Sequence, residues 1–322
     1  MGTPVLRVCL TEREIHDRFL QSLARRQLRE LFFYWFPSSV LAWLRLCASR
    51  RYRNYARSLI LCQRAAPWLS AQLPASRAIQ WISVGCGQGV KEVPFLRAAV
   101  RRRLRLAYIP WDASQTLLET ACARALPLGV PTLGMKADVE EAAHWGHLPL
   151  RRPGQVRVLS VFGNTLGALG LRRFLDRADG VLARGDWLLM DGELFAGEET
   201  LAGYDHPANR AFVTAPLRAV GVTDADGEVQ FALRAPDSRW PVGSVRKQFL
   251  FRRATTVHVA GQVVRFRRGD RIAMSPSDKY AVDGMTRHLA EDGRFAVADR
   301  LLSPDRRFAL WLCRKRALSQ PP

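Results

Sequence analysis

A glycine-rich turn directly after an apolar run constrains this chain more than any other feature. Residues 79–84 are expected to form a buried strand, and Gly85-Cys86-Gly87-Gln88-Gly89 follows them at once. Glycines in such a turn let the backbone come close to a ligand, because no Cβ stands in the way. Residues 90–101 can form the helix that the turn opens. A tight strand-to-helix turn without a ligand would give the same pattern, so context has to decide.

The spacing of the glycines narrows the choice of ligand. A dinucleotide fingerprint has its third small residue one position later, where this chain has Val90. The G-x-G-x-G spacing instead resembles the first motif of class I S-adenosylmethionine (SAM) methyltransferases, whose loop packs against the amino-acid end of the cofactor. This resemblance implies SAM as the cofactor.

The chain is strongly basic, with 49 Lys and Arg against 29 Asp and Glu and a net charge of +20. An acidic partner such as nucleic acid or anionic lipid would explain this excess, and so would a solvated basic surface. The arginines are spread along the chain without a basic tail, which favours the solvated surface. The cysteines form no C-x-x-C pair and the histidines are scattered. We therefore expect reduced thiols, a cytoplasmic location and no metal site.

Residues 1–75 are predicted to be helical, with an N-cap at Thr11. The aromatic stretch 31–46 is interrupted at Pro37 and is too short to span a bilayer. It could be a helix docked on the core, a lid over an apolar substrate or a helix lying in a membrane interface. Residues 67–74 are predicted to be a linker because Pro bounds them.

From residue 78 to 193, predicted strands alternate with predicted helices, which indicates a parallel sheet with helices on both faces. Ligands bind at the carboxyl ends of the strands in such folds. Five residues fall at these ends: Gly85, Asp112, Asp138, Asn164 and Asp191. An acid after the second strand can accept both ribose hydroxyls, and an acid after the third can accept the adenine amino group. Taken singly, the same acids could be helix caps or solvated loop residues.

Residues 194–279 break the alternation, with a predicted hairpin that turns at Ala260-Gly261. A helix and two closing strands then complete the sheet. We predict an α/β fold with a seven-stranded, Rossmann-like class I methyltransferase sheet and a second α+β substrate domain. The methyltransferase domain would comprise residues 76–193 plus 280–322. A cap would comprise residues 1–75 plus 194–279.

From about residue 80 onward, the chain resembles the histidine-specific methyltransferase family of ergothioneine biosynthesis. Six segments match that family in order: Gly85–Gly89, Tyr108-Ile109-Pro110-Trp111-Asp112-Ala113-Ser114, Ala137-Asp138, Phe162-Gly163-Asn164-Thr165-Leu166-Gly167, Tyr204-Asp205 and Ser275-Pro276-Ser277-Asp278-Lys279-Tyr280. The first 75 residues match poorly.

The resemblance implies roles for individual residues. The implied cofactor-binding residues are Gly85, Cys86, Gly87, Gly89, Asp112, Ser114, Asp138 and Asn164. The implied substrate-binding residues are Ala168, Tyr204, Ser275 and Ser277. Tyr204 is also the candidate catalytic residue, because its hydroxyl could orient an amine nucleophile. His206 could accept a proton or be an exposed loop residue, and Asp191 and Glu193 could bind a cationic substrate group or only solvent.

Two departures concern the substrate half of the site. This chain has Ala168 where the family has the Asn that holds the substrate's amino group, and Ser275 where the family has the Glu that recognises imidazole. A pocket that loses such partners loses its discrimination. We therefore expect a SAM-dependent methyltransferase that N-methylates a small amino-acid-like or amine-containing molecule other than histidine. An RNA- or protein-directed methyltransferase and a non-catalytic SAM-fold partner protein are the alternatives.

Overall fold

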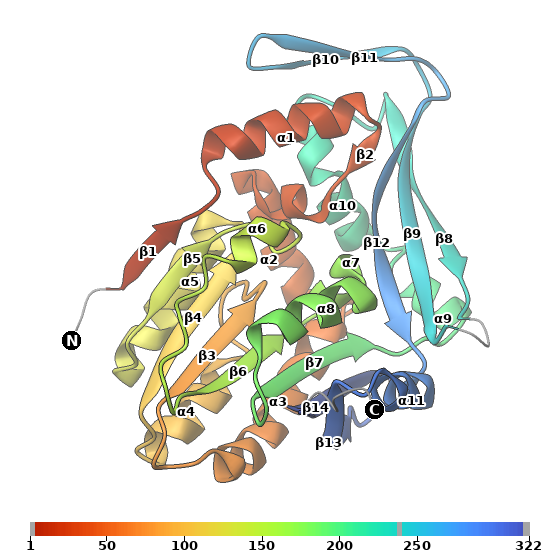
Figure 1. Ribbon diagram of the computed structural model, residues 1–322. Helices are drawn as coiled ribbons and strands as arrows, with labels where there is room; N and C mark the ends of the chain where they lie inside the picture. The colour runs from red at the N-terminus through yellow and green to blue at the C-terminus, as the bar shows by residue number, and fades with distance from the viewer. Residues whose placement is uncertain (1–3, 237–239, 318–322) are drawn as a thin grey trace, which may run out of the picture.

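The computed structural model describes residues 4–236 and 240–317, and a large central sheet dominates them (Figure 1). Its strand order is β1-β5-β4-β3-β6-β7-β14-β13. The strands are β1 (Val5–Val8), β3 (Ile79–Val84), β4 (Leu106–Asp112), β5 (Leu133–Lys136), β6 (Val156–Val161), β7 (Trp187–Glu193), β13 (Phe295–Leu302) and β14 (Phe308–Lys315). The pairs from β1 through β7 are parallel, whereas β14 runs antiparallel to both of its neighbours.

The predicted fold class is confirmed, but the predicted count of seven strands is wrong by one. β1 adds an eighth strand, which pairs with the edge strand β5. With only four residues, which are largely exposed, β1 carries no alternation long enough to be recognised in a sequence.

The inner strands of the sheet are buried on both faces. In β3, Ile79 and Trp81 pack into one hydrophobic cluster, whereas Ile82 and Val84 pack into another on the opposite face. β14 shows the same alternation. Because successive side chains of a strand point to opposite faces, a strand covered on both sides is apolar almost throughout. This explains why these strands could be recognised as continuous apolar runs.

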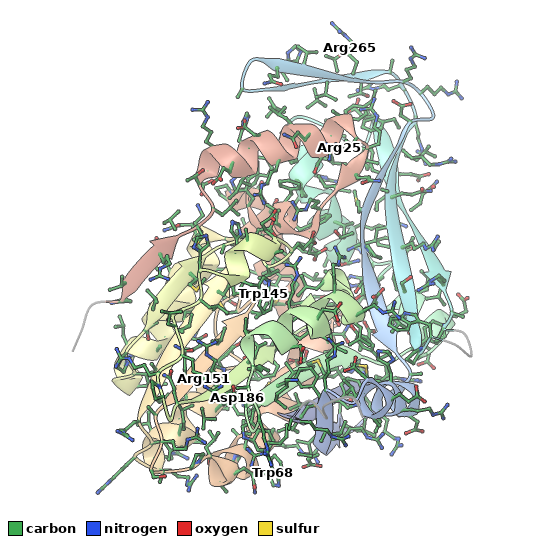
Figure 2. All side chains as sticks on the ribbon, viewed as in Figure 1. Arg25, Trp68, Trp145, Arg151, Asp186 and Arg265 are labelled. Carbon is green, nitrogen blue, oxygen red and sulfur yellow. The ribbon has the colours of Figure 1, made fainter. Side chains whose placement is uncertain are left out.

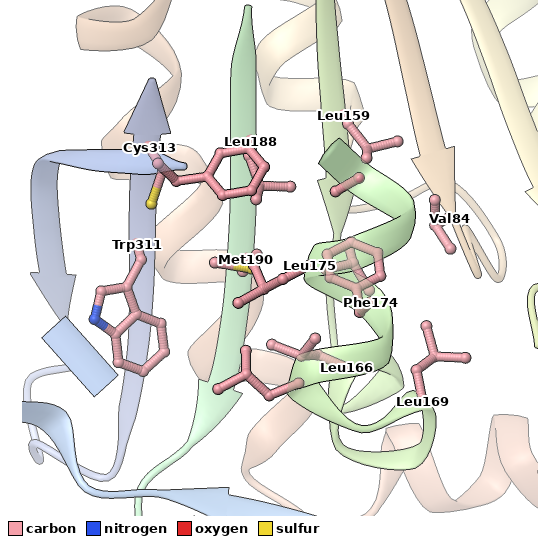
Figure 3. Packing of buried hydrophobic residues seen from close by; sticks show 14 of the residues in the cluster. Val84, Leu159, Leu166, Leu169, Phe174, Leu175, Leu188, Met190, Trp311 and Cys313 are labelled. Carbon is pink, nitrogen blue, oxygen red and sulfur yellow. The ribbon is translucent and has the colours of Figure 1, made fainter. Parts of the chain in front are cut away.

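Helices cover the two faces of the sheet as separate layers. One face packs against α3 (Asn54–Gln72) and α4 (Val93–Arg101), and the other against α8 (Leu171–Val181) and α11 (Val282–Asp292). Figure 3 shows Phe174 and Leu175 of α8 beside Met190 of β7, with Trp311 of β14 nearby. α5 (Gln115–Ala125) contacts β4 and β5.

A second unit stands beyond the carboxyl ends of the parallel strands (Figure 1). It contains a four-stranded sheet of order β2-β12-β9-β8 and the hairpin β10–β11, which turns at Ala260-Gly261 as predicted. Its elements are α1 (Glu12–Ala24), β2 (Gln27–Leu28), the 3-10 helix η1 (Glu30–Tyr34), α2 (Pro37–Ala48), α10 (Pro207–Arg218), β8 (Gly227–Arg234), β9 (Val242–Phe251), β10 (Thr255–Val259), β11 (Gln262–Phe266) and β12 (Arg271–Tyr280). A separate hydrophobic cluster holds these elements together.

The predicted linker at residues 67–74 is wrong, because α3 continues to Gln72 with Pro67 inside it. Leu61, Leu69 and Leu73 pack on the central sheet with Trp81. The burial of this apolar face outweighs the loss of one helical hydrogen bond at Pro67. α3 therefore packs with the central sheet, although it lies in the range predicted for the cap. The division into two separable domains stays a prediction.

Basic side chains are spread over the whole surface. Arg25 and Arg265 lie at the end of the second unit, whereas Arg151 lies near the opposite end, where it forms an ion pair with Asp186 (Figure 2). Many of the arginines have an acidic partner of this kind, so the positive charge is not gathered in one stripe.

Candidate active site

A cleft of about 870 Å³ opens at the carboxyl ends of β3, β4, β5 and β6, below the second unit. Loops after these strands form its floor, and η1 and α2 contribute to its roof. We call it the strand-end cleft. Its lining residues are Glu30, Leu31, Tyr34, Trp43, Tyr55, Gly85, Cys86, Gly87, Gln88, Val90, Lys91, Asp112, Ala113, Leu117, Asp138, Val139, Glu140, Phe162, Gly163, Thr165, Ala168 and Leu169.

The glycine turn lines one wall of the strand-end cleft, and backbone geometry requires its glycines. Gly85, Gly87 and Gly89 all have positive φ, between 53° and 70°. A Cβ on Gly87 would point into open space, whereas one on Gly89 would lie 3.0 Å from Ala121 of α5. Gly87 thus faces the ligand space, and Gly89 allows the close approach of α5.

Asp112 fixes this turn from the end of β4. One carboxylate oxygen accepts a hydrogen bond from the Gly87 amide at 2.9 Å, and the other accepts one from the Ser114 amide at 2.9 Å. Burial raises the pKa of the Asp112 carboxyl, while these backbone donors act in the opposite direction. The carboxylate still has lone pairs facing the cleft, since each of its oxygens accepts one protein hydrogen bond.

Asp138, predicted to bind adenine, follows β5 and lines the strand-end cleft, but its carboxylate is bound by residues of the second unit. Its carboxylate is buried and accepts hydrogen bonds from Arg18 at 2.9 Å and Arg29 at 2.6 Å. Arg29 also contacts Glu140, which lines the strand-end cleft. Asp138, just after β5, therefore joins the central sheet to the segments around α1 and η1.

A smaller pocket of about 420 Å³ adjoins the strand-end cleft, and the two share Glu30, Tyr34, Trp43, Gly163 and Ala168. We call it the inner pocket. Its remaining lining residues are Tyr52, Asn164, Tyr204, Asn209, Phe212, Val213, Lys247, Pro276 and Ser277. A molecule in the inner pocket would therefore meet a ligand of the strand-end cleft at the shared residues.

Aromatic side chains form one wall of the inner pocket. Trp43 contacts Tyr34, Tyr52 and Phe212, with ring centroids 5.4, 6.0 and 5.3 Å away respectively. Tyr34, Trp43 and Tyr52 come from the first 52 residues of the chain, whereas Phe212 belongs to α10. They give one side of the pocket an apolar surface, which lowers the local dielectric around the polar groups opposite.

Tyr204 sits at the floor of the inner pocket in a buried polar network. Its hydroxyl lies 2.7 Å from Nζ of Lys279, which donates to it, and 2.9 Å from Oγ of Ser277. Lys279 is also paired with Glu193 at 3.1 Å. Burial raises the pKa of Tyr204 well above its ordinary value, so the phenol stays protonated near neutral pH. Tyr204 can donate or accept a hydrogen bond here, but it is unsuited to act as a base.

The structure brings most of the predicted site residues together, with three exceptions. Gly85, Cys86, Gly87, Asp112 and Asp138 line the strand-end cleft, Asn164, Tyr204 and Ser277 line the inner pocket, and Ala168 lines both. Gly89, Ser114 and Ser275 line neither. Asn164, predicted at the cofactor, therefore lies on the side of the inner pocket.

The remaining polar candidates have structural partners. The interpretation of His206 as an exposed loop residue is wrong, because its ring is buried and accepts a hydrogen bond from the Asn209 amide as the N-cap of α10. Asp191 is buried within β7, where it accepts hydrogen bonds from Ser58 and from the Gly163 amide. Glu193 binds Lys279 and, at 2.8 Å, Asn54. Asp191 is therefore not solvated, and it holds the loop after β6 in place.

Several lining residues were not found from the sequence. Glu30 and Lys247 belong to segments that match no motif. Tyr34 and Trp43 lie in the aromatic stretch 31–46, for which a lid over an apolar substrate was one of the interpretations. Lys91 also lines the strand-end cleft and lies so close to Gly163 that a Cβ there would overlap Nζ. Its position just after the glycine turn is the sequence feature that could have indicated a role for Lys91 in the cleft.

The aromatic stretch 31–46 is divided between core and site. Phe32 and Phe33 are fully buried in the second unit, whereas Tyr34 and Trp43 line both cavities. Along the described parts of the chain, no helix combines the length and the apolar character needed to cross a bilayer.

Comparisons with known proteins identify a family and several similar solved structures. The model of the family described as histidine-specific, SAM-dependent methyltransferases matches residues 15–315. Among solved structures, similarity is found to a SAM-dependent methyltransferase from Clostridium acetobutylicum, with 12% identity, coverage of 83% of this chain and 92% of that chain, and a TM-score of 0.41. A sugar N-methyltransferase from Streptoalloteichus gives 14% identity, coverage of 83% and 91%, and a TM-score of 0.40.

A search of curated proteins gives no match. The family match covers far more than half of the chain and includes both the glycine turn of the strand-end cleft and the floor of the inner pocket. The chain therefore belongs to the family of histidine-specific, SAM-dependent methyltransferases, and its cofactor is S-adenosylmethionine.

Proposed function

We propose that this methyltransferase N-methylates a small amine-containing acceptor other than histidine. The observation that carries the proposal is the contrast at the junction of the two cavities. The strand-end cleft keeps its glycine turn and both acids, whereas Ala168, at the junction, offers no polar atom where the family has an Asn. Ser275, where the family has a Glu, lines neither cavity.

The residues of the strand-end cleft fit the cofactor. Gly87 leaves open space for a ligand beside the turn, and the buried Asp112 has free acceptor lone pairs for ribose hydroxyls. Asp138 offers the acceptor for the adenine amino group, and Lys91 is a cation suited to the cofactor's carboxylate. SAM, when bound, supplies a methyl group that is already activated by its sulfonium.

The protein's own task is then to orient the acceptor's lone pair and exclude water. Catalysis of this kind depends on placing the reacting atoms about 3–3.5 Å apart in line. Tyr204 can orient an amine through its hydroxyl, and Lys279 and Ser277 hold that hydroxyl in position. The aromatic wall keeps water away from the junction. An inner pocket lined by side chains of the second unit and by the loop after β6 favours a small acceptor over a polymer.

Methyl-labelled SAM tests the proposal. The purified protein is incubated with labelled SAM and cell extract, and separately with free histidine, and labelled products are identified by mass spectrometry. We expect a labelled amine from the extract and at least about tenfold slower turnover of histidine, because Ala168 and Ser275 do not supply the side-chain contacts that the family makes to the amino group and imidazole of histidine. Ala168→Asn, which restores one such partner, should raise the histidine rate. Efficient methylation of free histidine by the unaltered protein would contradict the proposal.

A further inference from the structure

Two oppositely charged side chains, Glu30 and Lys247, lie in the wall of the inner pocket without a hydrogen bond between them. Oε2 of Glu30 is closed to solvent and has no hydrogen-bond partner. The nearest cationic atom is Nζ of Lys247, at 3.8 Å, which is beyond hydrogen-bonding distance. Both residues line the inner pocket, and Glu30 also lines the strand-end cleft.

Among the described residues, none donates a hydrogen bond to Oε2 of Glu30, and Lys247 is nearly buried beside it. Tyr34 donates a hydrogen bond to the other oxygen of Glu30, at 3.3 Å, which leaves Oε2 free. The Lys247 side chain is 5% exposed, and its Nζ lies 5.2 Å from the centre of the Phe33 ring. Burial lowers the pKa of Lys247, and nearby Lys279 acts in the same direction, whereas Glu30 opposes them.

A purely structural ion pair would close to hydrogen-bonding distance, at about 2.7–2.9 Å. Leaving a buried polar group unpaired costs about 1–3 kcal/mol, so an open pair at a cavity wall is a poor stabilising device. A ligand with both charges would satisfy both groups. A further acceptor is available beside them, because Oδ1 of Asn164 is also buried without a partner.

We propose that Glu30 and Lys247 determine acceptor specificity: Glu30 binds the acceptor's amine, at the junction with the cofactor, and Lys247 binds an anionic group of the same molecule. The acceptor class is therefore an amine that carries a carboxylate, phosphate or sulfonate a few bonds away. This inference rests on the proposed function, and it assigns the polar contacts that Ala168 and Ser275 no longer provide. The two residues come from η1 and β9, so the pair exists only in the folded second unit.

The test uses Glu30→Gln and Lys247→Met with two readouts. The first is calorimetric binding of probe amines to the complex with the demethylated cofactor product. The probes are β-alanine, γ-aminobutyrate and the corresponding amides, which keep the amine but have an uncharged carboxamide in place of the carboxylate. The second is the charge of the labelled product from cell extract, measured by electrophoresis at neutral pH. Glu228 and Arg252, an exposed pair beside the same sheet, give the matched controls Glu228→Gln and Arg252→Met.

We expect wild-type protein to prefer the acids over the amides by about tenfold or more, and Lys247→Met to lose that preference. Glu30→Gln should weaken binding of acids and amides alike, and the controls should change neither. SAM affinity should stay within about twofold in Lys247→Met and in the two controls, which also shows that they are folded. Thermal unfolding shows whether Glu30→Gln is folded, because Glu30 also lines the strand-end cleft. An unchanged preference in Lys247→Met, or a labelled product without an acidic group, overturns the inference. Loss of SAM binding or absence of any labelled product from the wild-type protein would instead overturn the proposed function.

Discussion

The strand-end cleft and the inner pocket are adjacent but built in different ways. The glycine turn contributes backbone to one wall of the cleft, and Asp112 holds this turn by accepting a hydrogen bond from the Gly87 amide. Side chains from widely separated segments form the inner pocket, and charged groups and aromatic rings carry its chemistry. A change in the cleft should therefore act on the cofactor through backbone shape. A change in the inner pocket should act on the acceptor through polar contacts.

The largest expected effect is that of Gly87→Arg. The new side chain would enter the open space beside the turn, and φ at this position is +53°, which an L residue adopts only with strain. We expect SAM affinity to fall by about a thousandfold or more, measured by calorimetry, because the cofactor's space is filled. Gly154→Arg is the matched control, since Gly154 also has positive φ and open surroundings but lies far from the cleft. Comparable SAM affinity in the two variants would refute the assignment of the cleft.

Glu92, just after the glycine turn, should make stability depend on pH. Burial raises its pKa from 4.5 to about 7, so the folded state holds this proton more tightly than the unfolded state. The resulting stabilisation is complete below about pH 4.5 and is lost as the pH rises through about 7. Glu92→Gln should remove this loss and be more stable than the parent at pH 8, by up to about 3 kcal/mol.

Urea denaturation at several pH values between 4.5 and 8 measures the effect of Glu92→Gln. Glu291→Gln, at an exposed position on α11, is the control and should follow the parent. Parallel pH curves for the parent and Glu92→Gln would show that this carboxyl is ionised in the folded protein.

Tyr204→Phe sharpens the comparison from the side of the inner pocket. The substitution removes the hydroxyl that lies between Lys279 and Ser277 but touches no residue of the glycine turn. We expect turnover to fall by about 10–30-fold with SAM affinity nearly unchanged, because one polar contact to the acceptor is lost. Single-turnover kinetics and calorimetry measure the two quantities. Tyr280→Phe is the control, since the Tyr280 hydroxyl is buried without a hydrogen-bond partner. Reduced SAM binding in Tyr204→Phe would mean that the two cavities are not separate in function.

The smallest expected effect is that of Ser275→Ala. Ser275 lies at an irregularity in the pairing of β12 with β9 and lines neither cavity. Turnover of the natural acceptor and SAM affinity should both stay within about twofold of the parent values. Ser277→Ala, two residues further along the same strand, is the informative partner and should reduce turnover. A strong effect of Ser275→Ala would show that the inner pocket reaches the irregularity in the pairing of β12 with β9.

The strand-end residues of the cleft, such as Gly85, Gly87 and Asp112, could be predicted because each belongs to a short local pattern. A glycine turn after an apolar run and an acid at the end of a strand are visible within a few positions, and parallel strands bring these ends to one edge of the sheet. Glu30 and Lys247 are 217 positions apart in the printed sequence and meet only through packing of the second unit. No pattern in the sequence indicates that two such distant residues form a pair. His206 was misjudged for the same reason, because only the structure shows the helix end that it caps.

The second unit is joined to the central sheet on both sides of the cleft mouth. Near β1, the amides of Cys9 and Leu10 donate to the Lys136 carbonyl at 2.9 and 3.1 Å. On the other side, the chain leaves at Leu194 and returns at Tyr280, where the Phe195 amide donates to the Tyr280 carbonyl at 3.0 Å. A unit that is joined to the sheet at separate places cannot rotate about a single hinge. We therefore expect the second unit to stay in place while the spent cofactor departs, with only local side-chain motion at the mouth of the cleft.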